Sequence, residues 1–247
     1  MPRAGSTPLR ARCPGLLSGL LVLALWLLSL LSPGATFWLD NALAQLPATS
    51  QRLIEQAQAR YGNATAAMVS DWLELQAGLE GSEPALQLEK INSFFNRRLR
   101  FEDDIDIWQQ ADYWATPLET MSKRAGDCED FAIAKYVSLR RLGVGDEQLR
   151  LIYVRARIGG PQSSISQAHM VLGYFASPDA DPLILDNLID DIRPGSRRPD
   201  LSPVFSFNSA GLWVGGASNS SADPSARLSR WRDLLSRMQA EGVELQP

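Results

Sequence analysis

After residue 46, the first half of the chain has apolar residues at every third or fourth position, the spacing that places them on one side of an α-helix. The pattern predicts these helices: 47–61, 63–79, one that begins near Ser82, 116–126 and 127–143. We expect Asn63 and Ser82 to cap two of them, because short polar side chains accept hydrogen bonds from the first free backbone N–H groups. Residues 101–114 are acidic and break the pattern, which predicts a solvated loop, with a second ion site as the alternative.

The helix expected over residues 127–143 is apolar on most of its sides. Phe131 belongs to one apolar stripe, while Ile133 and Val137 belong to a second. A helix with this pattern is buried, so we expect it to be the central helix of the domain. Asp127 is a favourable N-cap residue for it.

From residue 149 onwards the apolar period changes from 3.6 to 2, which indicates β-strands. The expected strands are 149–158, 168–175 and 183–188, with weaker candidates at 204–208 and 211–216. An amphipathic helix follows at about 225–241, with these residues on its apolar face: Leu228, Trp231, Leu235 and Met238. Helices followed by strands indicate an α+β fold, in which a buried helix packs on an antiparallel sheet.

Residues 1–44 have the pattern of an export signal. Three arginines precede an apolar run at residues 16–31, and the small residues 42–44 form a possible cleavage site. An uncleaved membrane anchor is the alternative. Positive charge before the run keeps the amino end in the cytoplasm, so the rest of the chain is expected in the periplasm. We interpret residues 45–247 as one domain, with a helical lobe at about 47–124 and a catalytic core at about 125–216.

The exported part is acidic, with 21 basic and 27 acidic side chains after residue 44. It has no basic tract with interleaved aromatic residues, so nucleic acid is not an expected partner. No glycine-rich phosphate loop follows a strand, so we expect no directly bound nucleotide. This part holds a single cysteine, Cys128, and therefore cannot form an internal disulfide. A lone cysteine in an exported protein indicates an intermolecular partner or a reactive thiol.

Three residues form a candidate catalytic set. Cys128 lies in the first turn of the central helix, where free N–H groups and the helix dipole favour the thiolate; a small buried core residue is the alternative. His169 is the only histidine and hence the one candidate for a general base of the usual kind, although a lone histidine is often structural. Asp186 is a carboxylate inside an apolar strand. Antiparallel pairing of the two strands places His169 and Asp186 toward the same end of the sheet.

Asp127, Glu129 and Asp130 surround the cysteine. Like charges disfavour a thiolate, so free carboxylates would work against a nucleophile. Clustered carboxylate oxygens suit Ca²⁺, whereas the alternative is capping and compensation of the helix dipole.

Several motifs resemble a known family. The sequence reads WATPLET before the cysteine, then GDCED, AHMVL and LILDNL in that order. In these motifs the chain resembles the bacterial transglutaminase-like cysteine proteinases, the LapG-type periplasmic proteases, from about residue 50 to about residue 213. The resemblance implies a papain-like fold of the transglutaminase type. It also implies that Cys128 is the nucleophile, His169 the base and Asp186 the orienting carboxylate.

The resemblance further implies a cofactor and partners. Ca²⁺ would bind at Asp127 and Glu129, and at Asp130. The substrate would be a large surface adhesin, cleaved near its amino terminus at a di-alanine site, which releases the cell from a biofilm. An inner-membrane receptor for cyclic di-GMP would sequester the protease. Two alternatives stay open at this point: transglutaminase or amidase chemistry through the same thioester, and a non-catalytic Ca²⁺-dependent binding module.

Overall fold

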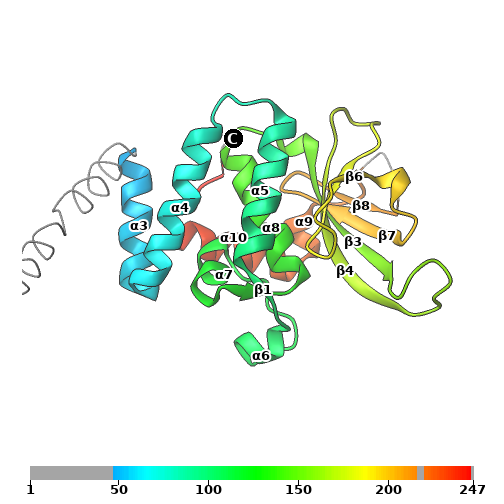
Figure 1. The fold of residues 1–247 in the computed structure, drawn as a ribbon, viewed down its shortest axis with the longest axis horizontal. Coiled ribbons are helices and arrows are strands. Elements are labelled where there is room, and N and C mark those ends of the chain that lie inside the picture. Colours follow the sequence, from blue (N-terminus) through cyan, green and yellow to red (C-terminus); the bar gives the residue numbers. More distant parts are fainter. Residues whose placement is uncertain (1–46, 216–219, 246–247) are drawn as a thin grey trace, which may run out of the picture. The chain divides into compact units, whose positions relative to one another are not determined.

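The computed structural model describes residues 47–215 and 220–245, so the predicted export segment lies outside the described residues. Among the described residues, no helix combines the length and hydrophobicity needed to cross a membrane. Within this part, helices lie on one side and a mainly antiparallel sheet on the other (Figure 1). The predicted α+β class is confirmed.

The helices follow the predicted order with two corrections. A short helix, Asp104–Trp108, lies in the stretch expected to be a loop, and the helix expected at about 225–241 is divided in two because the backbone of Leu228 is extended. The helices are α3 (Ala48–Tyr61), α4 (Asn63–Leu79), α5 (Pro84–Arg98), α6 (Asp104–Trp108), α7 (Pro117–Lys123), α8 (Cys128–Arg141), α9 (Pro224–Arg227) and α10 (Ser229–Ala240). Two predicted caps are wrong. Asn63 is the first helical residue after a Gly62 cap, and its side chain accepts from Gln58 of the preceding helix. Glu83, and not Ser82, precedes α5, whose first residue is a proline that has no N–H to cap.

The strands form two sheets. The larger has the order β6-β5-β4-β3-β7-β8, with every neighbouring pair antiparallel. Its members are β3 (Leu149–Arg157), β4 (Ser166–Tyr174), β5 (Leu183–Leu185), β6 (Arg193–Pro194), β7 (Leu201–Phe207) and β8 (Leu212–Val214). The smaller is a parallel pair of β1 (Arg100–Phe101) and β2 (Ala125–Gly126).

Three predicted positions are wrong in detail. His169 is the fourth residue of β4 and does not open it, because the β3–β4 pairing extends back to Ser166. Asp186 follows β5 and is not inside it. Its Oδ1 accepts from the Leu188 N–H and its carbonyl accepts from Asn96, so the local turn replaces strand pairing. In α10, Leu234 is buried together with Trp231 and Met238, whereas Leu235, which was expected on this face, is only half-buried.

Helix α8 is the centre of the fold, as predicted. It packs against α5 and α7 on one side and against β4 and β3 on the other (Figure 1). Ile133 and Val137 have no exposed surface. A buried hydrogen bond of 2.8 Å from the Trp72 indole to the Ser138 hydroxyl ties α4 to α8. Full burial of an aliphatic side chain is worth about 1.5–3 kcal/mol, so these contacts fix the position of α8.

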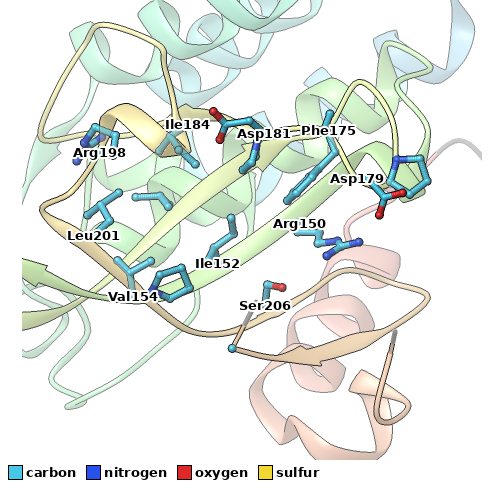
Figure 2. Close-up of a pocket in the computed structure, with 17 residues that line it drawn as sticks. Arg150, Ile152, Val154, Phe175, Asp179, Asp181, Ile184, Arg198, Leu201 and Ser206 are labelled. Atoms are coloured by element: carbon cyan, nitrogen blue, oxygen red, sulfur yellow. The ribbon is translucent and has the colours of Figure 1, made fainter. Parts of the chain in front are cut away.

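The central strands β3 and β4 of the larger sheet have buried apolar residues on both faces. Leu151 and Leu172 alternate with Ile152 and Val171, so each strand has apolar residues on both sides. The second set belongs to a separate apolar cluster. A cavity of about 430 Å³ lies between that cluster and the loops that follow β4 and β6 (Figure 2). Arg198 is at one end of this cavity.

The packing of α8 yields a stability prediction. Replacement Ile133→Ala should lower the free energy of unfolding by about 2–5 kcal/mol, since it removes buried methyl groups and leaves a cavity. Urea denaturation measures this change. The matched control is Ile165→Ala, because Ile165 is 68% exposed and should change stability by about 0.5 kcal/mol or less. Equal small effects at both positions would contradict the central place of α8.

Candidate active site

Cys128 is the first residue of α8, directly after the short strand β2 and its N-cap. The cap is Asp127, as predicted, and its Oδ1 accepts from the Glu129 backbone N–H at 3.2 Å. The Cys128 thiol donates to Glu129 Oε2 at 2.8 Å. The backbone N–H of Met170, in β4, favours the thiolate and acts to lower the thiol pKa. The cysteine is therefore at the amino end of a buried helix that packs against β4.

His169 lies in β4, the strand that packs against the helix of the cysteine. Its Nε2 lies 2.8 Å from Asp186 Oδ1, and both side chains are almost fully buried. Because Nε2 is hydrogen-bonded to the Asp186 carboxylate, Nδ1 is the ring nitrogen that is available to accept a proton from the thiol. The structure thus joins His169 to Asp186 and packs the helix that carries Cys128 against the strand that carries His169, while the catalytic roles of the three residues stay a prediction.

The Asp186 carboxylate is held at both oxygens. Oδ1 also accepts from the Leu188 N–H at 3.0 Å, and Oδ2 accepts from Arg198 Nη2 at 2.8 Å. Burial alone would raise the pKa of Asp186, but the hydrogen bonds from His169, Leu188 and Arg198 lower it to about 2. Asp186 is therefore ionised at all pH values near neutrality, as an orienting carboxylate must be.

A cluster of carboxylates lies beside the thiol. One oxygen each from Asp104, Asp127 and Asp130 lies within 4.8 Å of the others, and Asp104 forms a second such group with Asp112 and Glu129. The clustering has a direct electrostatic cost. Burial and the charges of Glu129 and Asp130 raise the pKa of Asp127 to about 10. Burial likewise raises the pKa of Asp104 to about 6.

The loop before α7 orients two of these carboxylates. The Tyr113 backbone N–H donates to Asp104 Oδ2, and the Ala115 N–H donates to Asp130 Oδ1 at 2.8 Å. The second oxygens, Asp104 Oδ1 and Asp130 Oδ2, are buried and have no hydrogen-bond partner among the described residues. Buried anionic oxygens without partners fit a hard cation, and an all-oxygen set is the donor set that Ca²⁺ prefers.

Sequence reasoning missed Asp104 and Asp112 as members of this cluster. Their stretch was expected to be a solvated loop, with a separate ion site as the alternative. In the structure, β1 pairs with β2 so that Phe101 is opposite Gly126, which delivers Asp104 to the cysteine turn. The acidic composition of this stretch indicated a possible ion site. Only the long-range pairing of β1 with β2 shows that Asp104 lies next to Asp127 and Asp130.

Gly126 permits the close approach of the cluster. A Cβ atom at this position would lie 2.7 Å from Asp130 Cβ and 2.8 Å from its Oδ2. Any larger residue would therefore displace the Asp130 carboxylate. This explains why the residue before the Asp127 cap is a glycine.

The residues of this site lie within a segment that matches a known protein family. The family model for the bacterial transglutaminase-like cysteine proteinase BTLCP matches residues 71–199, more than half of the chain. The chain belongs to the bacterial transglutaminase-like cysteine proteinase family. It is a cysteine peptidase, and the resemblance seen in the sequence motifs is confirmed.

Solved structures confirm the transglutaminase-like fold of this family. An EGTA-treated LapG from Legionella pneumophila is 39% identical, with a TM-score of 0.67 over 78% of this chain and 98% of that chain. A calcium-bound LapG from the same organism is also 39% identical, with a TM-score of 0.65 over 76% of this chain and 98% of that chain. No curated protein sequence matches the chain.

The surroundings of the thiol favour its protonated form. Burial, followed by the charge and the hydrogen bond of Glu129, raises the pKa of the Cys128 thiol far above its ordinary value. The Met170 N–H acts in the opposite direction. The carboxylates beside Cys128 therefore oppose formation of the thiolate.

Because Glu129 disfavours the Cys128 thiolate, removal of its charge should make the cysteine more reactive. In the presence of EDTA, Glu129→Gln should increase the rate at which iodoacetamide alkylates Cys128, because loss of the adjacent charge lowers the thiol pKa. A fall of one pKa unit corresponds to about a tenfold rise in thiolate at neutral pH. Mass spectrometry of the Cys128 peptide measures the rate. Glu102→Gln, at a surface ion pair with Arg100, is the control and should leave the rate unchanged.

Proposed function

We propose that Cys128 is the nucleophile of this cysteine peptidase, His169 its general base and Asp186 the carboxylate that orients the imidazole. The supporting observation is the 2.8 Å hydrogen bond between His169 Nε2 and Asp186, together with the packing of β4, which carries His169, against α8, which carries Cys128. Cys128 and His169 belong to buried secondary structure, and Asp186 is held by the hydrogen bonds of the turn after β5.

The first half of the reaction forms an acyl-enzyme. His169 Nδ1 takes the thiol proton, and the Cys128 sulfur attacks the scissile peptide carbonyl to give a tetrahedral intermediate. As that intermediate collapses, the imidazolium gives its proton to the leaving amine, and the C–N bond breaks. Asp186, ionised and hydrogen-bonded to Nε2, stabilises the imidazolium throughout.

The second half releases the product. His169 Nδ1 removes a proton from water, and the resulting hydroxide attacks the Cys128 thioester. The second tetrahedral intermediate expels the sulfur, which regains its proton from the imidazolium. The carboxylate product leaves and the free thiol is restored. Attack by an amine on the same thioester would instead join two chains, so the fate of the acyl group distinguishes a peptidase from a transglutaminase.

We further propose that Ca²⁺ is held by Asp104, Asp127 and Asp130, with Glu129 and Asp112 as additional carboxylates. The support is the pair of buried, partnerless oxygens in this cluster and the calcium-bound structure of the related LapG. The bound cation would supply positive charge that offsets the carboxylates beside the thiol. It would thereby remove the electrostatic opposition to the Cys128 thiolate.

The proposed substrate and setting rest on family resemblance. We propose that the enzyme acts in the periplasm, after export by the signal in residues 1–44. The proposed substrate is a large surface adhesin cut near its amino terminus at a di-alanine site, so that cleavage releases the cell from a biofilm. An inner-membrane receptor for cyclic di-GMP is the proposed inhibitory partner.

The catalytic assignment predicts graded losses of peptidase activity. On an adhesin fragment with a di-alanine site, Cys128→Ala should abolish cleavage, and His169→Ala should lower kcat by about 10³-fold or more. Asp186→Asn should lower kcat by about 10²–10⁴-fold, because the imidazole tautomer is no longer held. Product masses, recorded with an added amine donor, report hydrolysis or amine transfer. Full cleavage by Cys128→Ala would refute the role of Cys128 as the nucleophile.

The metal assignment predicts a contrast within helix α6. Asp104→Asn should weaken Ca²⁺ binding, measured by isothermal titration calorimetry, by about tenfold or more, which corresponds to about 1.4 kcal/mol. Asp106→Asn, an exposed residue of the same helix, is the matched control and should bind as the unaltered protein does. Equal affinity in both variants would remove Asp104 from the proposed ligand set.

A further inference from the structure

Arg198 is a buried guanidinium that the reaction scheme above does not use. It directly follows the 3-10 turn Gly195–Arg197. Its side chain is 2% exposed, and its Nη2 donates to Asp186 Oδ2 at 2.8 Å. The same guanidinium contacts Asp200 through Nε at 3.0 Å and through Nη2 at 2.8 Å. One buried cation therefore joins the Asp186 carboxylate to a second, partly exposed carboxylate.

Each oxygen of Asp186 has its own partners. Oδ1 accepts from His169 and from the Leu188 N–H, whereas Arg198 is the partner of Oδ2. The Asp186 side chain has no exposed surface, so water would not replace a lost donor readily. A buried acceptor left without its donor costs about 1–3 kcal/mol, and more when the acceptor is charged. Arg198 thus sets the rotation of the carboxylate plane about the Cβ–Cγ bond.

The position of Arg198 is itself fixed by the sheet. Its carbonyl accepts from the Leu201 N–H at 3.0 Å, where β7 begins. The Asp200 carbonyl accepts from the Arg157 N–H at the end of β3, at 2.8 Å. Arg198 also borders the cavity on the outer face of the sheet (Figure 2). The guanidinium is therefore held by elements other than the helix that carries the cysteine.

The other buried cation nearby does not have this geometry. Lys135 lies on α8 and is 1% exposed, and its Nζ is 5.7 Å from the Phe131 ring centroid. No hydrogen bond joins Lys135 to Asp186 in the described part of the chain, whereas Arg198 makes one at 2.8 Å. Asn96 donates to the Asp186 carbonyl and to Asp190 Oδ1, so it anchors the backbone of Asp186 and does not set the orientation of its carboxylate.

We propose that Arg198 is a positioning residue for catalysis, which holds the Asp186 carboxylate in the plane that it needs to orient the His169 imidazole. The inference rests on the proposed function, since it assumes that Asp186 orients the base. Arg198 does not contact the substrate in this scheme. Its loss should affect the chemical step and leave substrate binding largely unchanged.

The test compares Arg198→Gln, Arg198→Lys and the control Arg193→Gln in the purified protein with Ca²⁺ present. Arg193 belongs to an exposed ion pair with Asp191 near the same turn, so the control removes the same type of charge outside the site. For Arg198→Gln we expect kcat on the di-alanine fragment to fall about 10–100-fold, with KM changed by about twofold or less. Arg198→Lys should recover part of that loss, and Arg193→Gln should match the unaltered enzyme.

A spectroscopic readout separates positioning from general stability. The chain has one histidine, so a downfield ¹H NMR signal of a hydrogen-bonded imidazole N–H is assignable to His169 alone. We expect Arg198→Gln to shift or broaden this signal, while circular dichroism shows an intact fold. A folded Arg198→Gln that keeps both the kcat and the signal of the unaltered enzyme would overturn the proposal.

Two further variants keep the test decisive. If Arg198→Gln does not fold, Asp200→Asn tests the proposal in its place. This variant weakens the ion pair between Arg198 and Asp200 and leaves Asp186 unaltered. A lower kcat with an altered His169 signal supports the proposal, and an unchanged pair of values overturns it. Asp186→Asn separates the two hypotheses. Full activity in that variant would refute the proposed function, whereas an impaired Asp186→Asn beside a fully active Arg198→Gln would refute only the role of Arg198.

Discussion

The burial of α8 is the constraint on which the rest of the structure depends. Its amino end must carry the cysteine at a fixed point, because α5, α7 and the sheet hold the helix on its opposite sides. Strand β4, which carries His169, packs directly against it. The turn after β5 adds Asp186, which is hydrogen-bonded to His169. The buried helix thus gives the cysteine a fixed place relative to the sheet that carries the histidine.

The same terminus collects negative charge. A helix amino end favours anions, and this one is surrounded by carboxylates from α6 and from its own first turn. Burial makes the arrangement costly, as the raised pKa values of Asp104 and Asp127 show. Such a cost is expected if the cluster holds the proposed cation next to Cys128. In that case the acidic residues that oppose the thiolate also make its formation depend on the metal.

Much of this arrangement could be predicted from the sequence because it depends on local pattern. The change of apolar period located the central helix and the sheet, and antiparallel pairing placed His169 and Asp186 together. The acidic residues of α6 could not be placed, since a long-range pairing of β1 with β2 brings Asp104 to the site. The role of Arg198 could not be predicted either, because it belongs to no recognised motif and a turn places it next to Asp186. Two helix caps were also predicted wrongly: Gly62 caps α4 in place of Asn63, and α5 begins at a proline after Glu83.

The most direct test of the account is the reactivity of Cys128 in the unaltered protein with and without calcium. In the proposed scheme, the carboxylates beside Cys128 oppose its thiolate until a bound cation compensates their charge. The account predicts that iodoacetamide labels Cys128 faster with Ca²⁺ than with EDTA, and that His169→Ala removes this difference. Equal labelling rates in both conditions, or no labelling in either, would contradict it.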